Sequence, residues 1–207
     1  IEKRARLLGP NFSTFYKNPV HIVRGEGVWL WDNDGKKYLD CYNNVPHVGH
    51  CHPHVVDSIT AQAKTLNTHT RYLHDGILNY VERLISKHHE KIESAIMVCS
   101  GSEANDIALR MAEAHTGKKG IIVTDSTYHG NTSLVSQLSY GRNAIGGIGE
   151  DIRYVSAPNS LRGKKENNLI EKELFTQNVM GAIDSLEEAG IGVSALLICP
   201  FFANEGF

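Results

Sequence analysis

The chain has 207 residues, of which 41% are hydrophobic and 21% are charged, and its formal net charge is −2. This composition is typical of a globular chain with a sizeable core, and the near-neutral charge argues against a nucleic-acid partner or a basic membrane-binding surface. No apolar run approaches the roughly 20 residues of a membrane-spanning helix, and no hydrophobic signal segment follows the first residues.

The cysteines are scattered along the chain and form no CxxC pair; they are Cys41, Cys51, Cys99 and Cys199. Free thiols without a pairing pattern are typical of a reducing compartment. We therefore expect a cytoplasmic protein.

The N-terminal part is expected to be an irregular arm followed by a small antiparallel sheet. Residues 1–19 show no clear periodicity, whereas residues 20–40 contain three strand-like runs rich in β-branched and aromatic residues. Asp32-Asn33-Asp34-Gly35 is a turn signal between the last two runs.

The next stretch, residues 41–54, is unusually rich in polar side chains. Four histidines and a cysteine lie between His47 and His54, which leaves two interpretations open: a metal site, or a polar loop that lines a cleft. Pro53 suits the first turn of a helix, which we expect to run to about Lys64.

A second polar loop, residues 66–75, carries Arg71 and Tyr72. The planar guanidinium of arginine matches carboxylate and phosphate groups, although a surface ion pair is an equal alternative for Arg71. Apolar residues at helical spacing then predict a helix over about Gly76–His89.

From residue 94 onward the pattern alternates between strand and helix. The expected strands are Ala95–Cys99, Gly120–Thr124, Ile152–Ser156 and Val193–Cys199, and the expected helices are Ser102–His115, Asn131–Leu138 and Ile170–Ala189. This alternation predicts a largely parallel sheet with helices on its faces. Ligands in such sheets bind beyond the carboxyl ends of the strands.

Two turns rich in small residues fall at such ends. Ser100–Asn105 leads from an apolar run into a helix, whose first N–H groups and positive dipole end favour an anion, typically a phosphate. An ordinary capped helix is the alternative. The second turn is Asp125–Gly130, which ends in Tyr128-His129-Gly130.

Ser100-Gly101-Ser102-Glu103-Ala104-Asn105 followed by Tyr128-His129-Gly130 resembles the class III (ω-) aminotransferases, which bind pyridoxal 5′-phosphate (PLP). The resemblance covers nearly the whole chain, including Gly25–Asp40 and the Gly49-His50-Cys51-His52-Pro53 loop. Residues 44–53 and 66–75 resemble the branch of that family that contains ethanolamine-phosphate phospho-lyases.

The resemblance implies an α/β protein of PLP fold type I, in which a mostly parallel sheet lies between helices in three αβα layers, preceded by the small antiparallel segment. Residues 1–52 would form the N-terminal arm and part of a small domain. Residues 53–207 would form the first part of the large PLP-binding domain. The family resemblance also implies a homodimer.

The family's site residues carry over to matching positions of this chain. Gly101 and Ser102 would hold the cofactor phosphate, Tyr128 would stack on the pyridine ring, and His129 would line the same cavity. The candidates for the substrate side are Asn44, Arg71 and Tyr72. The Schiff-base lysine and the aspartate that pairs with the pyridine nitrogen have no match before Phe207, so both are expected after it.

The implied function is that of a PLP-dependent enzyme acting on a small primary amine through an external aldimine. A lyase that eliminates a β-leaving group from phosphoethanolamine or aminoethylphosphonate is the preferred hypothesis. The alternatives are an ω-amino acid or amine:2-oxo acid transaminase, and a non-catalytic metal-binding module that uses His47–His54.

The chain departs from the family pattern near its end. It has Cys199-Pro200-Phe201-Phe202 where the family usually has Glu-Pro-x-Gln. Asn204 or Glu205 is the candidate for the acidic residue that follows in the family, and the sequence leaves that choice open.

Overall fold

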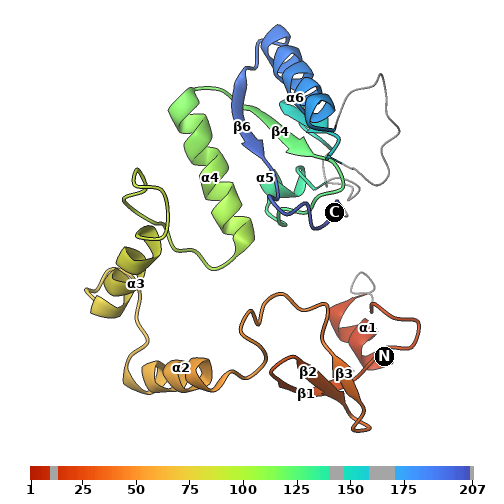
Figure 1. Cartoon of the computed structure of the whole chain (residues 1–207), viewed down its shortest axis with the longest axis vertical. Coiled ribbons are helices and arrows are strands. Elements are labelled where there is room, and N and C mark those ends of the chain that lie inside the picture. Colours follow the sequence, from red (N-terminus) through yellow and green to blue (C-terminus); the bar gives the residue numbers. More distant parts are fainter. Residues whose placement is uncertain (10–13, 140–146, 159–170, 206–207) are drawn as a thin grey trace. The chain divides into compact units, whose positions relative to one another are not determined.

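The computed structural model describes residues 1–9, 14–139, 147–158 and 171–205. Contacts between Cα atoms divide the chain into two compact units, Ile1–Leu78 and Asn79–Phe207. Figure 1 labels the elements of both units.

The first unit contains the expected antiparallel sheet. Its strands are β1 (Ile22–Glu26), β2 (Trp29–Asp32) and β3 (Lys37–Leu39), in the order β1-β2-β3. The β2–β3 turn is built on Asp32, whose Oδ1 accepts the N–H groups of Asp34 (3.0 Å) and Lys36 (2.8 Å). Its Oδ2 accepts the Tyr38 hydroxyl at 2.6 Å, and this bond, more than the backbone ones, lowers the pKa of Asp32.

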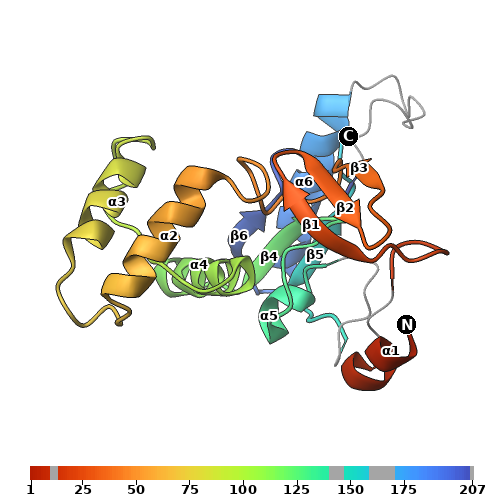
Figure 2. The ribbon, with the colours of Figure 1, turned by 90° about the horizontal axis from the view of Figure 1, so that it is seen from below.

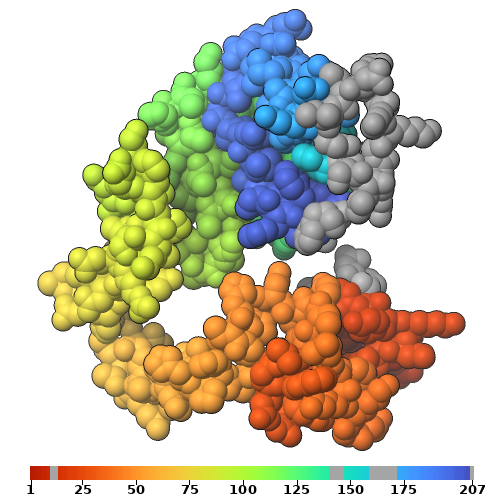
Figure 3. Space-filling view, in the orientation of Figure 1, coloured from red at the N-terminus to blue at the C-terminus, as the bar shows by residue number. Residues whose placement is uncertain are grey.

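The helices of this unit partly match the expectations. The helix predicted to begin at Pro53 is confirmed as α2 (Pro53–Thr65). It buries none of its residues and lies at the surface (Figure 3). The irregular arm was wrong for residues 2–8, which form the short helix α1 (Glu2–Leu8). It has an acidic first turn and a basic last turn that suit the helix dipole. Helix α1 buries no residue. Its sequence therefore needs no apolar face, and periodicity could not predict it. The helix α3 (Asp75–Ile85), in which the boundary between the two units falls, ends before His89.

The second unit is built on a parallel sheet in the order β5-β4-β6. Its strands are β4 (Gly120–Thr124), β5 (Ile152–Val155) and β6 (Val193–Leu197). Every residue of the central strand β4 is buried. This explains why its sequence is a continuous apolar run rather than an alternating one.

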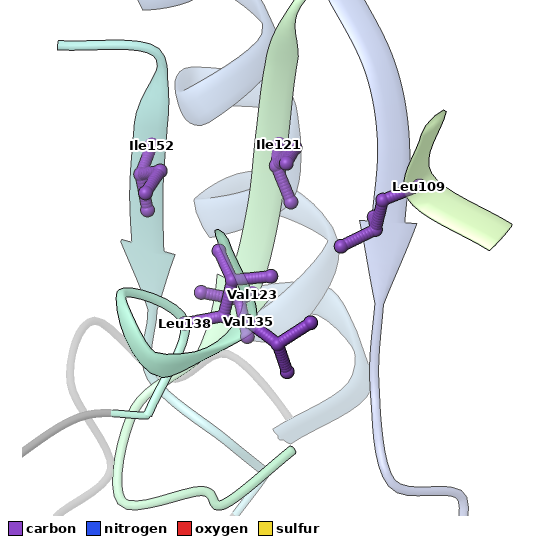
Figure 4. Close-up of a cluster of buried hydrophobic side chains, with 6 residues drawn as sticks. All are labelled: Leu109, Ile121, Val123, Val135, Leu138 and Ile152. Atoms are coloured by element: carbon purple, nitrogen blue, oxygen red, sulfur yellow. The ribbon is translucent and has the colours of Figure 1, made fainter. Parts of the chain in front are cut away.

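Helices cover both faces of this sheet, so the three αβα layers are confirmed (Figure 2). On one face, Ile121 and Val123 pack with Leu109 of α4 (Gly101–Thr116) and with Val135 of α5 (Ser133–Ser136), as Figure 4 shows. On the other face, residues of α6 (Glu171–Glu188) pack against Ile122 and Val155. Successive β4 side chains thus serve opposite layers, as the period of two requires.

One expected strand was wrong. Ala95–Cys99 belongs to no strand, and its residues are exposed. A strand exists only where its N–H and C=O groups pair with a neighbour, and no described segment pairs with these residues. The prediction that this apolar run is a strand of the sheet was therefore wrong within the described residues.

Among the described residues, no helix combines the length and apolar character needed to cross a bilayer.

The packing of α6 generates a stability prediction. Leu186 is fully buried, so Leu186→Ala should lower the free energy of unfolding by about 2–5 kcal/mol, since it removes contacts and leaves a cavity. Met180 on the same helix is 51% exposed, and Met180→Ala should change this free energy by less than about 0.5 kcal/mol. Chemical denaturation measures both, and equal losses would contradict the assigned core.

Candidate functional site

The N-terminus of α4 is capped in a way that leaves two N–H groups free. Ser100 is the N-cap, and its Oγ accepts the Glu103 N–H at 3.2 Å. Glu103 Oε2 in turn accepts the Cys99 N–H at 2.8 Å. This resembles a capping box shifted by one residue. The N–H groups of Gly101 and Ser102 have no acceptor among the described residues, so they are available to an anion.

A close backbone approach joins this helix start to the turn after β4. Ser102 Oγ accepts the Asn131 N–H at 3.1 Å. Gly130 has φ +145°, and a Cβ there would lie 2.6 Å from Ser102 Oγ, so only glycine fits. A Cβ at Gly101, by contrast, would meet no atom within 4 Å. The N–H groups of Gly101 and Ser102 and the Ser102 hydroxyl are called the cofactor cup below. A larger side chain is excluded at Gly130, whereas space remains at Gly101.

The same turn is fastened to α4 by a second contact, from Asn105. Its Nδ2 donates to the His129 carbonyl at 2.8 Å. The His129 N–H donates to Ser139 Oγ (3.3 Å), and its Nε2 lies 3.2 Å from Thr127 Oγ1. Tyr128 is 37% exposed, which leaves ring surface available for stacking. The structure thus joins the two motifs that the sequence separates.

His129 is half-buried, and the charge of Glu205 acts on it. Burial lowers the pKa of His129, while the negative charge of Glu205 acts in the opposite direction and raises it. Glu205 Oε1 accepts the hydroxyl of Thr124, the last residue of β4, at 2.7 Å. The sequence did not indicate Thr124, and it left open whether Asn204 or Glu205 takes the place of the acidic residue expected after β6. In the structure, Glu205 is the one that bonds to Thr124.

The remaining predicted site residues lie in the first unit. Asn44 is exposed on the loop after β3. Asp40 organises this loop, and its side chain is only 6% exposed. Its carboxylate accepts hydrogen bonds from the Asn43 N–H (2.9 Å) and Asn43 Nδ2 (2.9 Å). It also accepts from His50 Nε2 (2.6 Å) and the Tyr42 N–H (3.1 Å). These bonds, the Asn43 N–H first, hold the pKa of Asp40 well below its ordinary value. Asp40 was not predicted, although an acidic residue directly after a strand is a turn signal.

His50 holds this loop against the antiparallel sheet. Its N–H and C=O pair with Gly27 at 2.8 and 2.9 Å, and a Cβ at Gly25 would lie 2.8 Å from its ring. Within the described ranges, no three His, Cys, Asp or Glu side chains are arranged to hold a metal ion. The metal-binding interpretation of His47–His54 is therefore not supported, because His50 bonds to Asp40 instead.

Arg71 and Tyr72 are exposed on a short turn around His69. The Arg71 N–H donates to His69 Nδ1 at 3.2 Å, and the Tyr72 ring centroid lies 5.1 Å from that of His69. No carboxylate of the described residues forms an ion pair with Arg71, so the surface ion pair that was an alternative is not formed within them.

These features define an α/β domain that can hold a phosphorylated ligand at the carboxyl edge of its sheet. Residues 13–207 match the family described as Aminotransferase class-III. The chain belongs to this family, whose cofactor is pyridoxal 5′-phosphate.

The curated relatives include an alanine–glyoxylate aminotransferase 2-like protein of Drosophila melanogaster, 43% identical over 149 residues, which are 71% of this chain and 30% of the relative. Another is ethanolamine-phosphate phospho-lyase homolog 1 of Caenorhabditis elegans, 29% identical over 94% of this chain and 44% of the relative.

Among solved structures, a phospholyase from Arthrobacter in complex with phosphoethanolamine is 41% identical, with a TM-score of 0.89 over 97% of this chain and 48% of that one. A taurine:2-oxoglutarate aminotransferase from Bifidobacterium kashiwanohense, in complex with PLP and glutamate, shares the fold at 21% identity, with a TM-score of 0.79 over 94% of this chain and 46% of that one. The chain thus spans less than half the length of these relatives.

The hydrogen bonds of Asp40 generate a pH prediction. Its pKa is lowered on folding, so its contribution to stability is complete above its unfolded pKa of about 3.9 and is lost as the pH falls below that value. Asp40→Asn should lower the denaturation midpoint at pH 7 and flatten its fall between about pH 5 and 2. Asp57→Asn, on the exposed face of α2, is the matched control. Identical pH profiles for the two variants would contradict the assigned role.

Proposed function

We propose that the chain is part of a PLP-dependent lyase that removes the β-phosphate of phosphoethanolamine or a closely related small amine. The observation that supports it best is the 41% identity and TM-score of 0.89 to a phospholyase that binds phosphoethanolamine. The relative named as a phospho-lyase homolog, which aligns with 94% of the chain, supports the same proposal.

The described residues fit the cofactor. The free N–H groups of Gly101 and Ser102, with the Ser102 hydroxyl, are suited to a phosphate at the positive end of α4. Apart from its chain neighbours and its own helix backbone, no described atom lies within 4 Å of a Cβ built on Gly101, so a ligand has space there. In this proposal the Tyr128 ring stacks on the pyridine ring and His129 lines the cavity.

The cofactor, when bound, supplies the electron sink for a carbanion at the carbon next to the nitrogen. The chain's own residues hold and orient it. Helix α4 binds its phosphate, Tyr128 covers one ring face against water, and Asn105 keeps the His129 backbone in place through the 2.8 Å bond.

The substrate side of the proposal uses Asn44, Arg71 and Tyr72. The Arg71 guanidinium can take two phosphate oxygens at once. This would orient the leaving group, while the Asp40–His50 bond fixes the loop that carries Asn44. In the whole protein, we propose that residues 1–52 belong to the small domain and residues 53–207 to the first part of the large domain.

We also propose a homodimer in the reducing cytoplasm. The four cysteines are free thiols, which supports a reducing compartment. The exposed aromatic side chains of the first unit, such as Phe15 (77%) and Tyr42 (66%), offer apolar area for a subunit interface.

A transaminase is the second candidate, and the 43% identity to an alanine–glyoxylate aminotransferase 2-like protein supports it. Both reactions start from a primary amine and remove a proton from the carbon next to its nitrogen, so the same cofactor site serves both. They differ in whether a β-leaving group departs or a 2-oxo acid accepts the amino group.

The cup can be tested by Gly101→Ala in the full-length protein. The new methyl group meets no described atom beyond its chain neighbours and its own helix backbone, so stability should be unchanged, but it fills space that a phosphate would need. We expect the dissociation constant of PLP to rise about tenfold or more, which corresponds to about 1.4 kcal/mol.

The matched control is Gly181→Ala, also within a helix and also with no atom within 4 Å of the new Cβ. Titration by fluorescence or calorimetry measures both constants. An unchanged affinity in Gly101→Ala would exclude the α4 N-terminus as the phosphate site.

The reaction can be tested by incubating the full-length holoenzyme with phosphoethanolamine and no 2-oxo acid. A lyase should convert phosphoethanolamine and water into equal amounts of phosphate, ammonia and acetaldehyde. Turnover that requires an added 2-oxo acid, without release of phosphate, would refute the lyase and support the transaminase.

A further inference from the structure

Hydrogen bonds from neighbouring residues fix both the backbone and the ring of His129. Asn105 Nδ2 of α4 donates to the His129 carbonyl at 2.8 Å, and the His129 N–H donates to Ser139 Oγ at 3.3 Å. The ring is held at a separate point, because Nε2 lies 3.2 Å from Thr127 Oγ1. Thr127 is therefore the residue that determines how the imidazole is presented.

The Thr127 hydroxyl has one acceptor for its proton. Thr127 is 3% exposed, and within the described residues its hydroxyl forms a hydrogen bond with His129 Nε2 only. If the hydroxyl accepted an Nε2–H, its own proton would be buried without an acceptor, which is unfavourable. The hydroxyl is thus expected to donate its proton to Nε2.

This bond determines which nitrogen of the neutral imidazole carries the proton. A neutral imidazole has one N–H, and the nitrogen that accepts a hydrogen bond is the one without it. With Nε2 as the acceptor, the N–H is at Nδ1. Burial lowers the pKa of His129 and so favours the neutral ring, although the charge of Glu205 acts in the opposite direction.

Nδ1 lies on the accessible side of the ring. It forms no hydrogen bond with any described residue. Among the described residues, the buried side-chain polar atom that lacks a partner is Glu205 Oε2. Nδ1 also lacks one but is not among the buried atoms, so solvent or a ligand atom can reach it.

We propose that Thr127 is a positioning residue that holds His129 as the neutral Nδ1–H tautomer, through the hydrogen bond from its hydroxyl to Nε2. His129 then presents a hydrogen-bond donor, and not a base, at its accessible nitrogen. The matching ligand group is an anionic oxygen, whereas an ammonium group has no acceptor to offer. That this oxygen belongs to the cofactor rests on the proposed function, but the tautomer does not require the cofactor.

The tautomer can be measured directly in the full-length wild-type protein without PLP. NMR of ¹⁵N-labelled imidazoles, at a pH above the His129 titration midpoint, distinguishes a protonated ring nitrogen from an unprotonated one. His129 is assigned from the signals missing in His129→Gln. Nδ1 should show the shift of a protonated nitrogen and Nε2 that of an unprotonated one. The reverse pattern would overturn the proposal, and this measurement needs no variant that folds.

The role of Thr127 is tested by Thr127→Val, which keeps the branched shape and removes the hydroxyl. The Nε2–H form should then become populated, so that the two ¹⁵N shifts move toward each other. Thr127→Ser keeps the hydroxyl and should restore the wild-type pattern. Thr176→Val, at an exposed position of α6, is the control and should change neither shift. An unchanged pattern in Thr127→Val would overturn the role of Thr127.

The ligand is tested by adding PLP to the full-length protein. The His129 Nδ1–H proton should move downfield and exchange more slowly with water, as expected for a donor to an anionic oxygen. An Nδ1–H that bound PLP leaves unaffected would overturn the assignment of the cofactor as the acceptor. Failure of PLP to bind would refute the proposed function and leave the tautomer pattern of the PLP-free protein intact, so the two failures are distinguishable.

Discussion

The junction between α4 and the turn after β4 is the contact on which the candidate site depends. The Asn105 side chain donates to the His129 carbonyl, and the Ser102 hydroxyl accepts the Asn131 N–H. Gly130 permits the approach, because any larger residue would overlap Ser102. These contacts hold the start of α4 and the Tyr128–His129 segment in a fixed mutual position, as the proposed cofactor site requires.

The buried strand β4 provides the frame for this junction. Its side chains alternate between the α4–α5 layer and the α6 layer, so both helical layers are packed against one strand. At its carboxyl end the same strand presents Thr124, which anchors Glu205. The Thr124–Glu205 hydrogen bond thus extends the core at the end of β4, where the low dielectric strengthens it.

A separate polar centre organises the loop of the first unit. Asp40 receives four donors, among them His50, and it shapes the segment that carries Asn44. The histidine-rich sequence suggested a metal site, but His50 serves as a hydrogen-bond partner of Asp40 and a backbone bridge to Gly27. Composition alone cannot distinguish these roles, because a metal site requires several side chains to converge in space.

The sequence by itself determined the α/β class, the parallel strands β4, β5 and β6, and the motifs at Ser100–Asn105 and Tyr128–Gly130. Each of these depends on local signals: apolar runs, small-residue turns and helical periodicity. Only the tertiary structure decided that Ala95–Cys99 lacks a pairing partner among the described residues, that Gly130 packs on Ser102, and that Glu205 rather than Asn204 reaches Thr124. These depend on contacts between residues far apart in the chain, such as the 81-residue separation of Thr124 and Glu205, which no local pattern encodes.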